Sequence, residues 1–143
     1  MLISTKGRYA LRVMIDLSEH QSDGFIPLKV IAERQGISEK YLESIIKLLV
    51  KAQLLNGLRG KGGGYKLTKS PDQYTVGAIL RLTEDSLAPV ACLESGALPC
   101  DRMAECRTIS MWQELDKLIN NYLDSITIAD LVQQAPPGDY YVI

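Results

Sequence analysis

The tetrapeptide Gln-Gly-Ile-Ser at residues 35–38 lies between two short segments of helical periodicity, an arrangement that few folds contain. Residues 28–35 form the first segment, and Gly36 can end that helix in a left-handed conformation. Ser38 is a favourable N-cap for the second segment, at about residues 39–52. Two short helices joined by a tight, glycine-containing turn predict a helix-turn-helix, with an ordinary helical hairpin as the alternative. Apolar spacing supplies one buried face: Leu28, Ile31, Ala32, Ile37, Leu42, Ile45, Ile46 and Leu49.

A further helix is expected before this motif. Ser4 or Thr5 can cap a segment that extends to about Glu19, after which residues 21–24 (Gln-Ser-Asp-Gly) interrupt the pattern. The apolar residues of this segment recur at helical spacing: Ala10, Val13, Met14 and Leu17.

A glycine-rich turn follows the predicted helix-turn-helix. Residues 54–59 and 65–68 can each form a short strand around residues 60–64 (Gly-Lys-Gly-Gly-Gly). A hairpin in this position is a wing, and its tip carries Arg59 and Lys61 with little other side-chain bulk. Its backbone can therefore approach phosphates or enter a minor groove. A merely structural hairpin is the alternative, and a nucleotide-binding loop is disfavoured because neither glycine-rich nucleotide motif occurs here.

The C-terminal half combines a loop with an amphipathic helix. Thr75 is expected to cap a helix at 76–83, and Thr127 a short helix at about 128–134. Between them, apolar residues advance by three or four over about residues 106–124, which predicts a long helix. So broad an apolar stripe needs a partner surface; a second copy of the chain is expected, and the chain's own winged domain is the alternative. The stripe contains Ile109, Trp112, Leu115, Ile119, Tyr122 and Ile126, widened by Met111, Leu118 and Leu123.

These patterns predict a mainly α fold with a small β-wing: a winged helix-turn-helix plus a long C-terminal dimerisation helix. The expected organisation has four parts. They are a DNA-binding domain at 1–83, a cysteine-bearing sensor loop at 84–105, the dimerisation helix and a short C-terminal helix at 106–135, and a tail at 136–143.

Charge is distributed unevenly along the chain. Residues 1–67 contain 11 Lys and Arg against 6 Asp and Glu, whereas residues 68–143 contain 5 against 11. A basic first half favours nucleic-acid binding at one end only, with chance segregation as the alternative. No apolar run is long enough to span a membrane and no signal-peptide core is present, so a cytoplasmic location is expected. No nucleophile–base pair or paired-carboxylate site stands out, so an enzyme is not expected.

The second helix of a helix-turn-helix enters the major groove, with its N-terminal residues nearest the base edges. Lys40 and Lys47 suit phosphates, and Glu43 either accepts a hydrogen bond from a cytosine amine or points aside. With Arg59 and Lys61 of the wing, these residues form the predicted interface with double-stranded DNA. The remaining candidates can hydrogen-bond to phosphates or bases: Ser38, Tyr41 and Ser44.

All three cysteines of the chain, Cys92, Cys100 and Cys106, lie in one short stretch rich in loop-forming residues. Their odd number argues against a disulfide framework, and thiolates gathered on a loop favour soft metals or an iron–sulfur cluster. Their spacing lacks the C-x2-C pairs of structural zinc sites, and the single histidine, His20, lies in the first helix. The main hypothesis is an iron–sulfur cluster held by three thiolates and one further group. Zinc and three unliganded thiols are the alternatives.

Several short motifs of the chain are typical of one family. They are STKGRYA at 4–10, IAERQGIS at 31–38, YLE at 41–43, RG at 59–60, GGGY at 62–65, SIT at 125–127 and DL at 130–131. With these residues the chain resembles the IscR/NsrR/CymR-type (Rrf) family of bacterial winged-helix regulators over nearly its whole length. The resemblance implies a homodimer joined through the long helix, a palindromic operator, and Tyr41, Glu43 and Arg59 as DNA-reading residues. It also implies that the three cysteines hold a cluster, 2Fe–2S as in the IscR-like branch, which is favoured, or 4Fe–4S as in the nitric-oxide-sensing branch.

Two positions depart from the pattern of that family. Ile109 stands three residues after the third cysteine, where the IscR-like branch has a histidine. Arg8 stands where the nitric-oxide-sensing branch has an aspartate that serves the other subunit. The cysteine-metabolism branch works without a cluster and binds a partner enzyme, so the alternative function is a cluster-free regulator controlled by a protein partner or by thiol oxidation. The fourth ligand is open, with a bound thiol, water or one of four side chains as candidates: Glu94, Asp101, Glu105 and Ser110.

Overall fold

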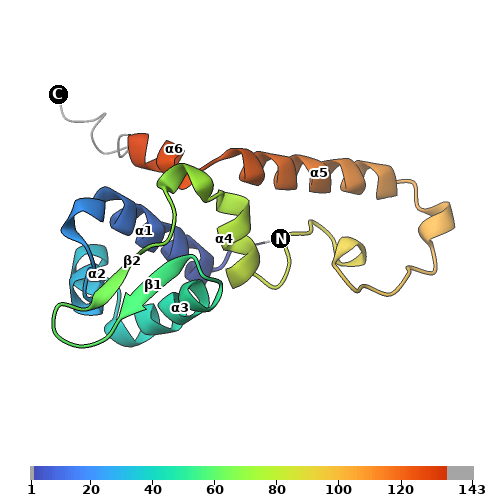
Figure 1. Cartoon of the computed structure of the whole chain (residues 1–143). Coiled ribbons are helices and arrows are strands. Elements are labelled where there is room, and N and C mark those ends of the chain that lie inside the picture. Colours follow the sequence, from blue (N-terminus) through green and yellow to red (C-terminus); the bar gives the residue numbers. More distant parts are fainter. Residues whose placement is uncertain (1, 135–143) are drawn as a thin grey trace, which may run out of the picture.

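Helix α1 (Thr5–Glu19) lies at the centre of the fold in a computed structural model that describes residues 2–134 (Figure 1). Ser4 is its N-cap, and the Ser4 side chain accepts a hydrogen bond of 3.0 Å from the Gly7 amide. The predicted apolar face of this helix is confirmed, because Ala10, Val13, Met14 and Leu17 are all buried in the main core.

The predicted helix-turn-helix is confirmed as α2 (Leu28–Gln35) and α3 (Glu39–Lys51). Gly36 adopts the left-handed conformation (φ 64°, ψ 35°), and the Ile37 amide donates to the Ala32 carbonyl at 3.1 Å. Ser38 then caps α3, its side chain accepting from the backbone of that helix. The turn therefore closes one helix and opens the next within three residues.

A two-stranded antiparallel sheet forms the wing, with β1 (Leu55–Leu58) paired to β2 (Gly64–Leu67). The first strand is one residue shorter at each end than predicted, and the second keeps its predicted length but begins one residue earlier. Ile26 pairs with Tyr65 of the second strand, with backbone hydrogen bonds of 2.9 and 2.8 Å. A Cβ at Gly64 would lie 2.2 Å from the Ile26 carbonyl carbon, so only glycine permits this close approach.

Helices α4 (Val76–Thr83), α5 (Ile109–Ser125) and α6 (Ile128–Gln133) complete the fold. The prediction that the long helix starts at residue 106 is wrong by three residues. Cys106 has an extended backbone (φ −74°, ψ 111°), and the Trp112 amide donates to the Thr108 carbonyl at 3.1 Å as the helix begins. The predicted tail at 136–143 lies outside the described residues. Short 3-10 turns occupy Gln21–Asp23, Pro71–Gln73, Ala91–Leu93 and Met103–Glu105.

Helix α5 projects away from the winged domain, and the cysteine-bearing segment runs out from α4 to the far end of α5 (Figure 1). Near its other end α5 packs on α4, where Leu123 joins a second small core built on Val76, Leu80 and Leu87. Along residues 2–134, no helix combines the length and apolarity needed to cross a bilayer.

The apolar stripe of α5 divides into two faces. Ile109, Trp112, Ile119 and Leu123 are half-buried. Of the whole stripe, Leu123 and Ile126 pack against the second core beside α4, so the alternative of packing on the chain's own domain holds for that end of the stripe. The second face, which we call the outer face, advances by four, three and four residues and is exposed to solvent. It consists of Met111, Leu115, Leu118 and Tyr122, which are 53, 37, 63 and 65% exposed.

Candidate functional site

A groove of about 550 Å³ separates α3 from the wing, and three of the predicted interface residues line it. Glu43 and Lys47 come from α3, and Arg59 follows β1. The wing can place Arg59 beside α3 because β1 contacts α3 and β2 is paired to Ile26 ahead of the helix-turn-helix. Residues far apart in the sequence thus meet at one surface.

Within the groove, Glu43 and Lys47 form an ion pair of 3.3 Å between Oε1 and Nζ, one helical turn apart. Both side chains are largely exposed, at 51 and 74%, so the pair is worth at most about 1 kcal/mol and separates easily. Glu43 lines the groove and has a neighbouring cation, which offsets its repulsion by phosphates.

The other predicted residues of α3 lie outside the groove lining. Ser38 and Lys40 are exposed at the start of the helix, and Tyr41 is half-buried. The Ser38 oxygen accepts from the Tyr41 amide at 3.2 Å, which leaves the Ser38 hydroxyl hydrogen free to donate. The Ser44 hydroxyl donates to the Tyr41 carbonyl at 2.7 Å, so Ser44 can offer DNA only an acceptor. Lys61 is exposed in the wing turn, also outside the lining.

The groove lining contains six further residues that were not among the predicted interface residues: Ile46, Val50, Lys51, Gly57, Leu58 and Tyr65. Lys51 lies one helical turn beyond Lys47, and that i, i+4 spacing was a usable signal. Leu58 and Tyr65 come from the two strands, and Leu58 is 49% exposed despite being apolar. No local pattern marks these two residues, because their place depends on how the hairpin packs against α3.

The cysteine segment holds three free thiols, with Cys92 and Cys106 half-buried and Cys100 exposed. Three soft sulfur donors suit an iron–sulfur cluster chemically. Within residues 2–134, however, no three His, Cys, Asp or Glu side chains lie close enough to hold a metal ion together. The donors therefore fit such a group, but holding it requires the segment to gather them.

Cys106 lies directly before α5. A side-chain hydrogen bond from Thr108, whose Oγ1 lies 3.5 Å from Sγ, holds the pKa of the Cys106 thiol below its usual value. Ile109, at the position of the family's histidine, is the first residue of α5 and has no ligating side-chain atom. All four candidate fourth-ligand side chains are exposed: Glu94, Asp101, Glu105 and Ser110.

The segment that carries the cysteines is tied to the DNA-binding domain at its first residue. Glu84 accepts hydrogen bonds from the Ser4 amide at 2.5 Å and from the Ser4 hydroxyl at 2.6 Å. Because Ser4 also caps α1, this residue links the end of α4 to the start of α1.

Comparison with known proteins gives a consistent result. Residues 3–134 match the family Rrf2, described as an iron-dependent transcriptional regulator. The HTH-type transcriptional regulator IscR of Aliivibrio salmonicida is 38% identical over 132 residues, covering 92% of this chain and 77% of the relative. The IscR of Yersinia enterocolitica is 39% identical, with 92 and 79% covered.

Solved structures agree with these sequence relatives. T. potens IscR superposes with a TM-score of 0.72 at 40% identity, covering 99% of this chain and 97% of the other. CymR, the global cysteine regulator of B. subtilis, superposes with a TM-score of 0.76 at 37% identity, covering 95% of this chain and 99% of the other. Both the predicted winged-helix fold and the predicted resemblance are confirmed. The chain belongs to the Rrf2 family of iron-dependent transcriptional regulators.

Proposed function

We propose that the protein is a homodimeric, sequence-specific DNA-binding regulator whose α3 enters the major groove of a palindromic operator. The observation that carries this proposal is the groove that brings Glu43, Lys47 and Arg59 together. Arginine forms bidentate hydrogen bonds with guanine, a carboxylate accepts from the cytosine amine, and lysine neutralises phosphate. The groove therefore offers both base readout and backbone contact.

The proposed organisation follows the expected parts. Residues 1–83 bind DNA, 84–105 sense the signal and 106–135 dimerise. The outer face of α5 supports the dimer, since four exposed apolar side chains follow one stripe of the helix. A two-fold dimer requires half-sites about one helical turn apart.

The DNA-binding proposal is tested with an operator selected from a random duplex library. We expect Arg59→Ala to weaken operator binding by about 1–3 kcal/mol, and Lys47→Ala to reduce the salt slope by about one. Lys117→Ala on α5 is the matched control, because it removes an exposed lysine far from the groove. If Arg59→Ala leaves both operator affinity and salt slope unchanged, the wing does not contact DNA.

We further infer that Cys92, Cys100 and Cys106 hold an iron–sulfur cluster, with 2Fe–2S favoured over 4Fe–4S. The support is the donor set on one accessible segment, the iron-dependent description of the family and the similarity to IscR. When bound, such a cluster supplies redox chemistry and a group that oxidants can remove. The chain's own part is to present three thiols, and the hydrogen bond from Thr108 lowers the pKa of the Cys106 thiol.

Anaerobic purification tests the cofactor. Iron and acid-labile sulfide should be present in equal amounts, and the visible and EPR spectra distinguish 2Fe–2S from 4Fe–4S. Each of Cys92→Ser, Cys100→Ser and Cys106→Ser should lower both contents, whereas Ser95→Ala in the same segment should not. A colourless, iron-free wild-type protein would refute the cluster.

The second candidate function is a cluster-free regulator controlled by a protein partner or by thiol oxidation. The similarity to CymR and the presence of Ile109 at the histidine position favour it. Iron-free protein that binds the operator tightly, and changes affinity when its thiols are oxidised or when a partner is added, would establish this candidate instead.

A further inference from the structure

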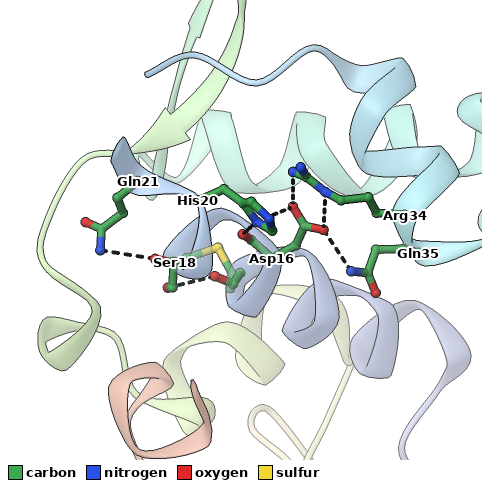
Figure 2. Close-up of polar contacts among 7 residues, drawn as sticks. Asp16, Ser18, His20, Gln21, Arg34 and Gln35 are labelled. Carbon is green, nitrogen blue, oxygen red and sulfur yellow. Dashed lines mark hydrogen bonds and ion pairs between the residues drawn. The ribbon is translucent and has the colours of Figure 1, made fainter. Parts of the chain in front are cut away.

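A continuous series of contacts joins the buried part of α1 to the first turn of α3. It begins at Asp16, whose side chain is 1% exposed and accepts hydrogen bonds from two residues of α2 (Figure 2). Arg34 donates through Nε at 3.1 Å and Nη2 at 2.7 Å, and Gln35 donates through Nε2 at 2.8 Å. The last turn of α2 is therefore fixed to α1 just ahead of the helix-turn-helix turn.

Gln35 connects this cluster to Arg12, one helical turn before Asp16 on α1. The Arg12 Nε donates to Gln35 Oε1 at 3.1 Å, and Arg12 Nη2 donates to the Gln35 backbone carbonyl. A carbonyl in the last turn of a helix has no partner within the helix, so Arg12 supplies one for α2. Arg12 thereby contacts the residue that immediately precedes Gly36.

Arg12 also contacts an aromatic pair that leads to α3. Its guanidinium lies over the Tyr9 ring, 4.9 Å from the ring centroid. Tyr9 in turn meets Tyr41 edge to face, with ring centroids 5.8 Å apart and an interplanar angle of 77°. Tyr41 is the third residue of α3, in the turn that lies nearest the base edges when such a helix enters the major groove.

Tyr41 is thus held from the α1 side before any DNA is bound. A side chain already fixed in one rotamer loses less conformational freedom when it binds, so operator affinity rises without a new DNA contact. Tyr9 and Tyr41 are partly buried and also pack on the main core, whereas Arg12 is exposed and contacts Gln35 and the Tyr9 ring. The effect of Tyr9 on operator binding therefore has to be separated from its effect on folding stability.

We propose that Tyr9 and Arg12 are positioning residues for operator recognition, acting through Tyr41 and the helix-turn-helix turn. The inference rests on the proposed function, since it assumes that Tyr41 contacts DNA. It assigns no DNA contact to Tyr9 or Arg12 themselves.

A double-mutant cycle on the full chain tests the proposal. The variants are Tyr9→Leu, Tyr41→Ala and the two combined, measured for affinity to operator and to random DNA over a range of salt concentrations. The energy of an aromatic pair of this kind limits what holding Tyr41 in place can add to about two- to tenfold in affinity. We therefore expect Tyr9→Leu to weaken operator binding by about that factor in the wild-type background and to have no effect in the Tyr41→Ala background.

Two further variants separate positioning from loss of folding. Tyr9→Phe keeps the ring and should bind the operator as wild type does, since the edge-to-face contact needs no hydroxyl. Arg12→Lys keeps the charge but loses the planar fork, and should weaken operator binding about two- to tenfold with an unchanged salt slope. Leu11→Ala is the control for stability, because Leu11 packs also on the second core beside α4. It should lower the unfolding midpoint without changing operator affinity.

The other possible results would refute either the positioning role of Tyr9 and Arg12 or the DNA contact of Tyr41. Equal losses for Tyr9→Leu in both backgrounds, or no loss in either, would refute the positioning role alone. Arg12→Gln removes the charge, and a salt slope lower by about one for this variant would show that Arg12 binds phosphate directly and would also refute the positioning role. If Tyr41→Ala binds the operator like wild type, the proposed DNA contact of Tyr41 fails and the inference fails with it.

Discussion

Arg81 of α4 and Asp124 of α5 form a bidentate ion pair, with Nη1–Oδ1 at 2.7 Å and Nη2–Oδ2 at 3.0 Å. The Arg81 Nη2 also donates to Asn120 Oδ1 at 2.8 Å. Gly77 lies against the same carboxylate, and a Cβ there would come within 2.1 Å of Asp124 Oδ1. The long helix is therefore joined to the DNA-binding domain by contacts that depend on both charge and shape.

Neutralising Asp124 should remove a pH-dependent contribution to stability. The hydrogen bond from Arg81 lowers the pKa of Asp124, so the folded protein is stabilised above the ordinary aspartate pKa of about 3.9. That stabilisation is lost as the pH falls through the lowered value. Because both side chains are more than 40% exposed, Asp124→Asn should cost at most about 1 kcal/mol at pH 7.

Urea unfolding at pH 7 and near pH 3 measures this difference. The difference in free energy of unfolding between wild type and Asp124→Asn should be smaller at the lower pH. Asp23→Asn, at an exposed aspartate in the 3-10 turn that follows α1, is the control and should show no difference from wild type at pH 7. A difference that widens on acidification would contradict the assignment of this contribution to the Arg81 pair.

Asp16→Asn should destabilise the helix-turn-helix by weakening the contact between α1 and α2. Asp16 is buried and accepts from Arg34 and Gln35, so the amide leaves a guanidinium without its anionic partner. Breaking a buried pair costs about 3–5 kcal/mol, but the Arg34 side chain is 30% exposed and can be hydrated. We therefore expect a loss of about 2–3 kcal/mol. Urea unfolding measures it against Asp23→Asn at an exposed aspartate, and equal midpoints for the two variants would exclude a structural role for the pair.

Gly64→Ala should displace the wing, whereas Gly62→Ala should not. The added methyl at position 64 would overlap the Ile26 backbone and break the pairing of Ile26 with Tyr65. At Gly62 nothing lies within 4 Å of the added carbon, so only the positive φ of 78° is strained, at about 1–2 kcal/mol. Operator affinity and the urea midpoint should both fall further for Gly64→Ala. Identical behaviour of the two variants would mean that strained φ, and not the contact with Ile26, governs the wing.

Leu118→Glu should convert a dimer into a monomer. Leu118 is central in the outer face of α5, and burying a carboxylate without a partner there costs about 2 kcal/mol or more per subunit. Analytical ultracentrifugation over a range of concentrations measures the dissociation constant. Gln113→Glu introduces the same charge at an exposed position on the side of α5 away from the outer face, and should leave the dimer intact. Wild-type protein that sediments as a monomer would remove the proposed dimer altogether.

Local patterns predicted most elements because their causes lie within a few residues. Ser4, Ser38, Thr75 and Thr127 each cap the helix that follows them, and each does so by accepting an amide from its own first turn. The start of α5 was missed since its periodicity extends back to Cys106, where a preceding 3-10 turn leaves the backbone extended. Apolar periodicity alone does not reveal a 3-10 turn of this kind.

The sequence by itself determined the order of helices, the helix-turn-helix with its wing, and the candidate residues, because caps, glycines and apolar spacing act locally. Only the tertiary structure decided which of those residues meet. Glu43 and Arg59 line one groove, the buried Asp16 pairs with Arg34, and Tyr9 packs edge to face against Tyr41. Such neighbours are set when separate elements pack, and at Asp16 also because a buried carboxylate needs hydrogen-bond partners. No short-range pattern records which residues of different elements will meet.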